Sequence, residues 1–231
     1  MPTILLLSGA HRYADPWHDF PETSACLARL ARGCGWEVEV TEDIDERLAA
    51  GLTGIDLLIV NAGDPWRTDG EPVAPSPDLL GRARAGLLDG LDAGLAILGL
   101  HTAAASLRDY PEFRRRLGGE WVRGVSWHPP YGPVHVRPLH DEIVEGCGDF
   151  TVHDERYTDL VIDEGVEPLA GTDEGPHILA WANRVGPTRV VYDALGHDTA
   201  SYDSAGHRAF LRRALSWLQP PVPSEHGRTG S

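Results

Sequence analysis

The sequence predicts an α/β protein, a three-layer sandwich in which helices cover both faces of a mostly parallel central sheet. Three apolar runs carry this prediction: Thr3 to Ser8, Ile55 to Val60 and Leu95 to Leu98. Each run is continuous rather than alternating, as is typical of strands buried on both faces. Helix-length segments separate the runs, and short apolar strands that alternate with helices indicate a parallel sheet between two helical layers.

The remaining elements of the first half follow from local patterns. Apolar residues recur at helical spacing from Glu22 to Arg32, and a Gly-Cys-Gly stop follows. Trp36 to Val40 alternates as a strand does. Pro77 to Asp92 has a helical pattern that internal glycines weaken. A further helix is expected from about Ala104 onward.

The second half is expected to be richer in strands. From Glu120 to Val136 the pattern is β-rich, although prolines interrupt it. Further short strands are expected at Phe150 to Val152, Val166 to Leu169, His177 to Asn183 and Arg189 to Tyr192. A final helix is expected from about Tyr202 to Leu218. We therefore expect one domain over residues 1–219, followed by a tail over 220–231 that is disordered because it is rich in Pro, Ser and Gly.

Composition limits the expected partners. With 231 residues and 42% hydrophobic content, the chain can bury one sizeable core. The net charge of −15 argues against nucleic-acid binding, and we expect the densest basic run, Arg114-Arg115-Arg116, to be the solvated face of a helix. An acidic protein also repels anionic membranes and polyanionic substrates, so a neutral small molecule or a metal-bound ligand is the expected partner.

Cysteine usage and hydropathy favour the cytoplasm. Cys26, Cys34 and Cys147 are too few and too scattered for a disulfide framework, and no CxxC pair suggests a zinc ribbon or a redox motif. No signal peptide is expected, and no apolar run approaches the roughly 20 residues of a membrane span. The cytoplasm is therefore the expected location, and a homo-oligomer is left open.

Ligands of open parallel sheets bind beyond the carboxyl ends of the strands, so functional residues are expected in the loops there. The run from Gly99 to Ala103 follows a strand and precedes an expected helix. A strand, a tight turn and a helix make a nucleophile-elbow geometry, which lifts one side chain above the sheet. That side chain is His101. The alternative is a histidine that caps the helix and hydrogen-bonds locally.

Other loops carry further candidates. His18, beside Asp19 in the loop after the first strand, could be a metal ligand, an acid or base, or a substrate contact; the alternative is an ordinary polar loop. Glu155 could be a general base or a metal ligand, or part of a solvated charged turn. His197 follows the last strand, and Asp198 could orient its ring or cap a helix.

Asp64 and Trp66 belong to a further loop of the same rim, and His128 with its two following prolines could cover the pocket. For these residues a structural role is favoured. A metal site requires that the histidines at 18, 101 and 197 converge with Glu155, which only the fold can bring about because they are dispersed in sequence. No GxGxxG motif follows the first strand, so no nucleotide cofactor is expected.

Several of these segments match one known pattern: the first strand with its histidine loop, Gly99-Leu100-His101, Asp154-Glu155-x-Tyr157, and Trp181 leading to Arg189-Val190-x-Tyr192-x-x-Leu195-Gly196-His197-Asp198. They resemble the ThuA-like family, named for trehalose utilisation, of the class I glutamine amidotransferase-like superfamily. The resemblance runs from about residue 3 to Trp217, and the Leu-Gly-His turn is more specific than the elbow. Where the family has Gly-Lys-Gly, this chain reads Val185-Gly186-Pro187-Thr188, which alters a hairpin turn.

The resemblance implies a flavodoxin-like sheet with a pocket above His101. In the amidotransferases the elbow carries a cysteine that attacks the glutamine amide, so a histidine there argues against glutaminase activity. The family is linked to 3-keto derivatives of disaccharides, which implies a carbohydrate substrate. The expected catalytic residues are His101, Glu155 and His197. The expected substrate contacts are His18, Asp64, Trp66, Tyr157 and Asp198.

The expected function is therefore an enzyme of disaccharide or keto-sugar metabolism. A divalent metal such as zinc, held by His18, His101 and His197, is the candidate cofactor. A His/Glu pair with a Lewis acid is suited to removing an α-proton, and elimination, isomerisation and hydrolysis all remain open. The alternative is a non-catalytic sugar-binding or regulatory protein, against which the ionisable rim counts.

Overall fold

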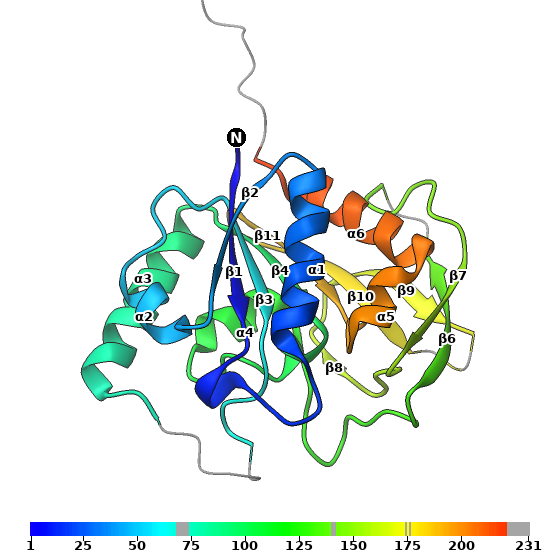
Figure 1. Ribbon diagram of the computed structural model, residues 1–231, viewed down its shortest axis with the longest axis horizontal. Coiled ribbons are helices and arrows are strands. Elements are labelled where there is room, and N and C mark those ends of the chain that lie inside the picture. The colour runs from blue at the N-terminus through cyan, green and yellow to red at the C-terminus, as the bar shows by residue number, and fades with distance from the viewer. Residues whose placement is uncertain (68–73, 140–141, 174, 176, 221–231) are drawn as a thin grey trace, which may run out of the picture.

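The computed structural model describes residues 1–67, 74–139, 142–173, 175 and 177–220 (Figure 1). Within this part of the chain, nine strands form one sheet in the order β2-β1-β3-β4-β11-β10-β9-β6-β7. The first five strands of that order pair in parallel: β2 (Glu37–Thr41), β1 (Thr3–Ser8), β3 (Leu57–Asn61), β4 (Ala96–Leu100) and β11 (Thr188–Asp193). This arrangement is the flavodoxin-like strand order predicted from the resemblance.

Antiparallel strands extend the sheet beyond β11. They are β10 (Ile178–Val185), β9 (Glu167–Thr172), β6 (Gly132–Pro138) and β7 (Phe150–Asp154). A separate short pair is formed by β5 (Gly119–Glu120) and β8 (Val161–Ile162). The antiparallel half matters for function because the chain leaves β7 at Asp154 and continues directly into Glu155.

Side chains of each buried strand alternate between two apolar layers. In β1, Ile4 and Leu6 belong to the core shared with α1 (Phe20–Gly33) and α6 (Ala205–Leu218). Leu5 and Leu7 belong to the core shared with α2 (Ile44–Ala49), α3 (Pro77–Asp92) and α4 (Pro111–Leu117). Each such leucine contributes roughly 1.5–3 kcal/mol of hydrophobic burial. The three-layer α/β prediction is therefore confirmed, with helices on both faces of the sheet (Figure 1).

The predicted helix from about Ala104 is wrong. The chain instead forms a short 3-10 turn, η2 (His101–Ala104), and α4 begins at Pro111. Leu107 has a left-handed backbone with φ of 46°, which is incompatible with a continuous α-helix. In α4, the basic run is only partly solvated. Arg115 is exposed, whereas Arg116 is mostly buried and pairs with Asp92.

Two predictions for the second half also need correction. From Glu120 to Val136, only the end of β5 and part of β6 are strands, because Gly124 closes a turn with φ of 80° and two prolines follow it. The predicted final helix is divided at Ser204 into α5 (Thr199–Asp203) and α6, since Ser204 is extended and its side chain caps α6. The segments α2 and β8 were not predicted, and residues 221–231 lie outside the described part.

The loops that matter for function start at the carboxyl ends of β1, β3, β4 and β11. Since these strands are parallel neighbours, their loops meet at one edge of the sheet. The 3-10 turn η1 (His11–Tyr13) opens the loop after β1. Among the described residues, no helix is long and apolar enough to cross a membrane.

Candidate metal centre

His101 occupies the elbow that follows β4. Its backbone is left-handed, with φ of 44°, an uncommon conformation for a residue other than glycine. Two contacts hold it there: the Tyr192 hydroxyl donates to the His101 carbonyl at 2.7 Å, and Nδ1 of the ring lies 2.7 Å from the carbonyl oxygen of Ala194. A carbonyl can only accept, so Nδ1 donates to it, and Nε2 is the ring nitrogen that faces Glu155. The ring is 1% exposed.

His18 is fixed by a carboxylate three residues earlier. Its Nδ1 lies 2.7 Å and 2.9 Å from the two carboxylate oxygens of Asp15. Asp15 is itself held by the backbone N–H groups of Trp17 and His18. The ring therefore donates from Nδ1 and turns Nε2 toward His101, whose ring centroid is 5.1 Å away. Residue His11, in the same loop, points elsewhere and pairs with Asp43.

Asp154 positions the other two members of the site. Its carboxylate accepts from the backbone N–H groups of Gly196 and His197, at 2.8 Å and 3.3 Å, and from that of Glu155 at 2.7 Å. Gly196 has φ of 116°, and a Cβ there would lie 2.8 Å from the Tyr202 hydroxyl, so the Leu-Gly-His turn requires glycine. One buried carboxylate thus ties the end of β7 to the turn after β11.

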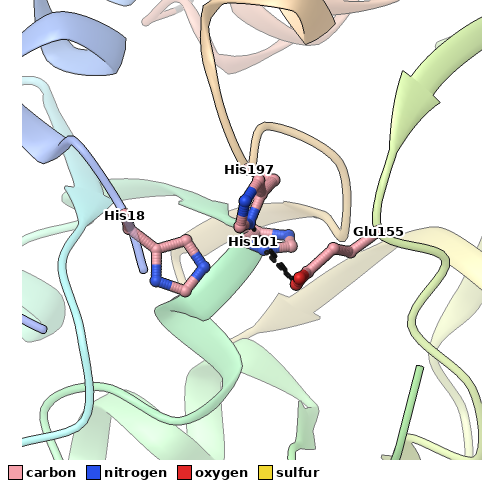
Figure 2. A group of neighbouring side chains, drawn as sticks. All are labelled: His18, His101, Glu155 and His197. Atoms are coloured by element: carbon pink, nitrogen blue, oxygen red, sulfur yellow. Dashed lines mark ion pairs between the residues drawn. The ribbon is translucent and has the colours of Figure 1, made fainter. Parts of the chain in front are cut away.

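These elements bring His18, His101, His197 and Glu155 together (Figure 2). Each offers one ligand atom, and the four atoms lie within 4.8 Å of one another. The Glu155 carboxylate is 3.5 Å from His101 Nε2 and 3.4 Å from His197 Nδ1. The convergence that the sequence left open is therefore present.

The histidine nitrogens that face the centre are buried and lack hydrogen bonds. Among the described residues, His18 Nε2, His101 Nε2 and His197 Nδ1 are all solvent-inaccessible atoms without a hydrogen-bond partner. An unpaired buried polar atom is destabilising by about 1–3 kcal/mol. Three of them facing one point make these residues a candidate metal-ligand set.

The electrostatics of the four groups differ. Burial opposes the charge of Glu155, but the neighbouring imidazoles of His101 and His197 hold the pKa of its carboxyl well below the usual range. Burial lowers the pKa of His18, and the neighbouring His101 and His197 add to this against the opposing effect of Asp15. Burial also disfavours protonated His197, yet Glu155 raises its pKa. At neutral pH the centre holds an ionised carboxylate and a neutral His18 ring.

The donor set suits a divalent metal. Zinc binds imidazole nitrogen and carboxylate oxygen at about 2.0–2.2 Å, so tetrahedral ligands lie roughly 3.4 Å apart. The two nitrogen-to-oxygen distances at Glu155 are 3.4 and 3.5 Å. Ligating histidines in metal sites commonly donate their other N–H to a carboxylate or a carbonyl. His18 donates to Asp15 in this way, and His101 to Ala194.

The centre lies beside a cavity of about 470 Å³. The lining residues come from the loops after β1, β3, β4 and β7 and from the 121–128 segment: Asp15, Trp17, His18, Asp64, Arg67, Thr102, Ala105, Trp121, Arg123, His128, Glu155 and Tyr157. A cavity of this size accommodates a small molecule. Tyr157 packs flat against the His101 ring, with centroids 4.2 Å apart.

Only some of the expected substrate contacts line the cavity. His18, Asp64 and Tyr157 line the cavity. Trp66 does not: it is 54% exposed, and its indole donates to Asp109. Asp198 is not among the lining residues either, and its carboxylate caps α5 by accepting from the Ala200 N–H. The capping alternative therefore describes Asp198 better than a substrate contact does.

Sequence reasoning missed three residues that shape the site: Asp15, Trp121 and Arg123. It also missed the positioning role of Asp154. Asp15 lies three residues before His18, a spacing that could have suggested the contact. Trp121 and Arg123 belong to a segment whose β-rich pattern concealed a loop. His128, expected to be structural, lines the cavity, and its Nε2 lies 3.6 Å from Glu155.

A family model described as ThuA, trehalose utilisation, matches residues 4–218. The chain belongs to this family. Its residues His18, His101, Glu155 and His197 all fall within the matched range. A comparison with curated protein sequences finds no match.

Solved structures show the same fold. A ThuA-like protein from Parabacteroides merdae has a TM-score of 0.72 at 14% identity, covering 97% of this chain and 94% of that one. A ThuA-like protein from Bacteroides uniformis has a TM-score of 0.70 at 17% identity, with coverage of 94% and 91%. A glutamine amidotransferase from Thermotoga maritima has a TM-score of 0.56 at 11% identity, with coverage of 94% and 97%. The ThuA chain thus has the glutamine amidotransferase-like fold.

Proposed function

We propose that this ThuA protein is a divalent-metal-dependent enzyme that acts on a small sugar derivative. The observation that carries the proposal is the set of three buried, unpartnered imidazole nitrogens facing one carboxylate beside a cavity. A purely structural cluster would pair these atoms with one another or with the backbone, because unpaired buried polar atoms destabilise the fold.

In this proposal the histidines at 18, 101 and 197 hold the metal, and Glu155 either completes the coordination or serves as the base. A bound divalent ion polarises a carbonyl or lowers the pKa of water. Glu155 is suited to accept a proton because its carboxylate is ionised and lies on the cavity side of the histidines. Tyr157, stacked on His101, keeps that ring in place.

The sugar assignment rests on two observations. The family is described by trehalose utilisation, which indicates carbohydrate chemistry. The cavity also presents Trp17 and Trp121, and aromatic faces of this kind pack against the apolar faces of sugar rings. A keto-sugar has an acidic α-proton, so proton abstraction next to a carbonyl is the reaction class that this centre serves best. Glutamine hydrolysis is not proposed, because His101 stands at the elbow.

Elemental analysis of the purified protein, with His101→Ala in parallel, tests the proposal. We expect about one zinc or other divalent ion per chain in the wild type and a loss of at least 10-fold in the variant, since one of few ligands is removed. His135→Ala is the matched control, because His135 pairs with Asp173 outside the cavity lining. A metal-free wild type after growth with added zinc would contradict the proposal.

Glu155→Gln separates the two roles of the carboxylate. If Glu155 is the base, the variant keeps its metal but loses exchange of the α-proton of a 3-keto-disaccharide with D₂O, measured by NMR. If Glu155 is a ligand, metal and exchange are lost together. Full exchange activity in a metal-loaded Glu155→Gln variant would remove Glu155 from the mechanism.

A further inference from the structure

The cavity wall next to the metal centre is rich in hydrogen-bond donors. Besides Glu155, two carboxylates line the cavity, and both already have partners. Asp15 accepts from His18, and Asp64 accepts from Arg108 at 3.0 Å and from Arg123 at 2.8 Å. No asparagine or glutamine is among the lining residues. Sugar hydroxyls both donate and accept hydrogen bonds, whereas a carboxylate or a phosphate only accepts and so matches guanidinium donors best.

The Arg123 guanidinium has hydrogen-bond donors that its contacts with Asp64 and Trp66 do not use. Both of its hydrogen bonds, to the Asp64 carboxylate and to the Trp66 carbonyl, use the same terminal nitrogen, Nη2. Within the part of the chain that the structure describes, Nη1 and Nε make none. The side chain is 47% exposed and lines the cavity. A guanidinium offers five N–H donors in a planar fork, so the remaining donors can grip a carboxylate or a phosphate.

One corner of the cavity carries positive charge beside Asp64. The guanidinium groups of Arg108 and Arg123 both pair with the single carboxylate of Asp64, and Arg67 also lines the cavity. A local excess of one sign of charge attracts groups of the opposite sign. The net charge of −15 favours a neutral ligand, whereas this corner favours an anionic group.

We infer that the substrate is an anionic sugar derivative whose carboxylate or phosphate group is bound by Arg123, with the charge of Arg67 assisting. The inference rests on the proposed function, because it assumes that the sugar end of the same ligand reaches the metal centre. Trp17 and Trp121 line the same cavity as Arg123, so in this inference the sugar ring packs on an indole while the anionic group meets the guanidinium.

Isothermal titration calorimetry at constant ionic strength tests this, with D-glucose, D-glucuronate and D-glucose 6-phosphate as probes. We expect at least one anion to bind wild-type protein roughly 10-fold or more tightly than glucose, since hydrogen bonds to charged groups are the stronger ones. Preference for glucuronate identifies a carboxylate, and preference for glucose 6-phosphate identifies a phosphate. Equal or tighter binding of glucose, or no binding of either anion, overturns the inference.

Arg123→Gln, with Arg137→Gln as its control, tests whether the preference for an anion depends on Arg123. Arg137 is an exposed arginine of β6 that pairs with Asp173 outside the cavity lining, so its variant should keep the preference. Arg123→Gln should lose most of it, and a preference that survives there overturns the assignment. The metal content of the same samples separates the two proposals. An Arg123-dependent preference in metal-free wild type would support the anion site while overturning the metal centre.

Discussion

Two histidine clusters flank the last parallel strand, and they use the same residue types in opposite ways. The first is the candidate metal centre, in which three imidazole nitrogens are buried without partners. The second is built on His207 of α6, whose Nε2 lies 2.8 Å from the Asp193 carboxylate. Its Nδ1 lies 3.0 Å from the Ser201 hydroxyl and 2.9 Å from the Ser201 carbonyl. In the described residues, the second cluster leaves no ring nitrogen unpaired.

The comparison shows that proximity alone does not identify a site. His207 contacts Ser201 through one ring nitrogen and Asp193 through the other, as the histidine of a hydrolytic triad contacts its serine and aspartate. However, His207 is 0% exposed and does not line the cavity beside the candidate metal centre. The clusters differ in their hydrogen bonds: the His207 cluster closes them internally and is not part of the cavity lining described above, whereas the candidate metal centre leaves them open beside that cavity. The closed His207 cluster stabilises the fold, and the open cluster is the one proposed to bind a metal.

The largest effect expected from this contrast is on stability. His207→Leu leaves the buried Asp193 carboxylate without its partner, which should lower the free energy of unfolding by about 3–5 kcal/mol. In metal-free protein, His101→Gln removes one hydrogen bond to a neutral carbonyl and should cost only about 1 kcal/mol. Urea denaturation of both variants checks the difference. Equal losses would mean that the two clusters are equally structural.

The same comparison predicts a pH dependence. Burial disfavours protonated His207, but the charge and hydrogen bond of Asp193, with a smaller contribution from Asp154, raise the pKa of the imidazole above its ordinary value. A raised folded-state pKa stabilises the fold fully below the unfolded value of about 6.5. That contribution is lost as the pH rises through the folded pKa. The stability difference between wild type and His207→Leu should therefore be largest below pH of about 6.5 and shrink above it.

Metal removal should give the next largest effect on stability, and it should act only through the candidate metal centre. A ligand present at 100 times its Kd stabilises the folded state by about 2.7 kcal/mol, which corresponds to a Tm shift of about 5–10 °C in a chain of this size. Chelation should lower the Tm of wild type by this amount and leave that of His101→Ala unchanged. A chelator effect of equal size in both proteins would place the metal elsewhere.

A smaller effect, on metal affinity, is expected from the carboxylate that orients His18. Asp15→Asn keeps the shape but removes the charge that orients His18. Loss of such a partner typically weakens metal affinity 10- to 100-fold. Competition with a chromogenic zinc chelator measures it, and Asp19→Asn serves as control because Asp19 caps α1 instead of contacting the ring. Unchanged zinc affinity in Asp15→Asn would show that His18 is oriented by packing alone.

The parallel core could be predicted because its signals are local. The apolar runs of β1, β3 and β4 mark strands buried on both faces, and α3 has the predicted bounds Pro77–Asp92. The region from Glu120 to Val136 could not, since its prolines and Gly124 decide the backbone against the β propensity of its side chains. The helix expected at Ala104 failed because tertiary contacts hold the elbow at His101 in a short turn.

For the site, the candidate residues could be named from the sequence, but only the fold brings them together. His18, His101 and His197 follow parallel strands, so their common edge was foreseeable once the strand order was known. Glu155 was less foreseeable, because it reaches the edge from an antiparallel extension. The supporting hydrogen bonds of Asp15 and Asp154 carry no periodic signal and depend on loop geometry alone.

Asp198 provides the smallest and sharpest test. It was expected to contact substrate, yet its carboxylate accepts from the Ala200 N–H as the cap of α5. Asp198→Ala should therefore lower the free energy of unfolding by about 1 kcal/mol, the usual cost of losing a cap, while metal content and ligand affinity stay at wild-type values. Asp198→Ser, which can still cap, should restore most of the stability. If Asp198→Ala instead weakens ligand binding 10-fold with unchanged stability, the turn after His197 belongs to the substrate site and Asp198 is a substrate contact after all.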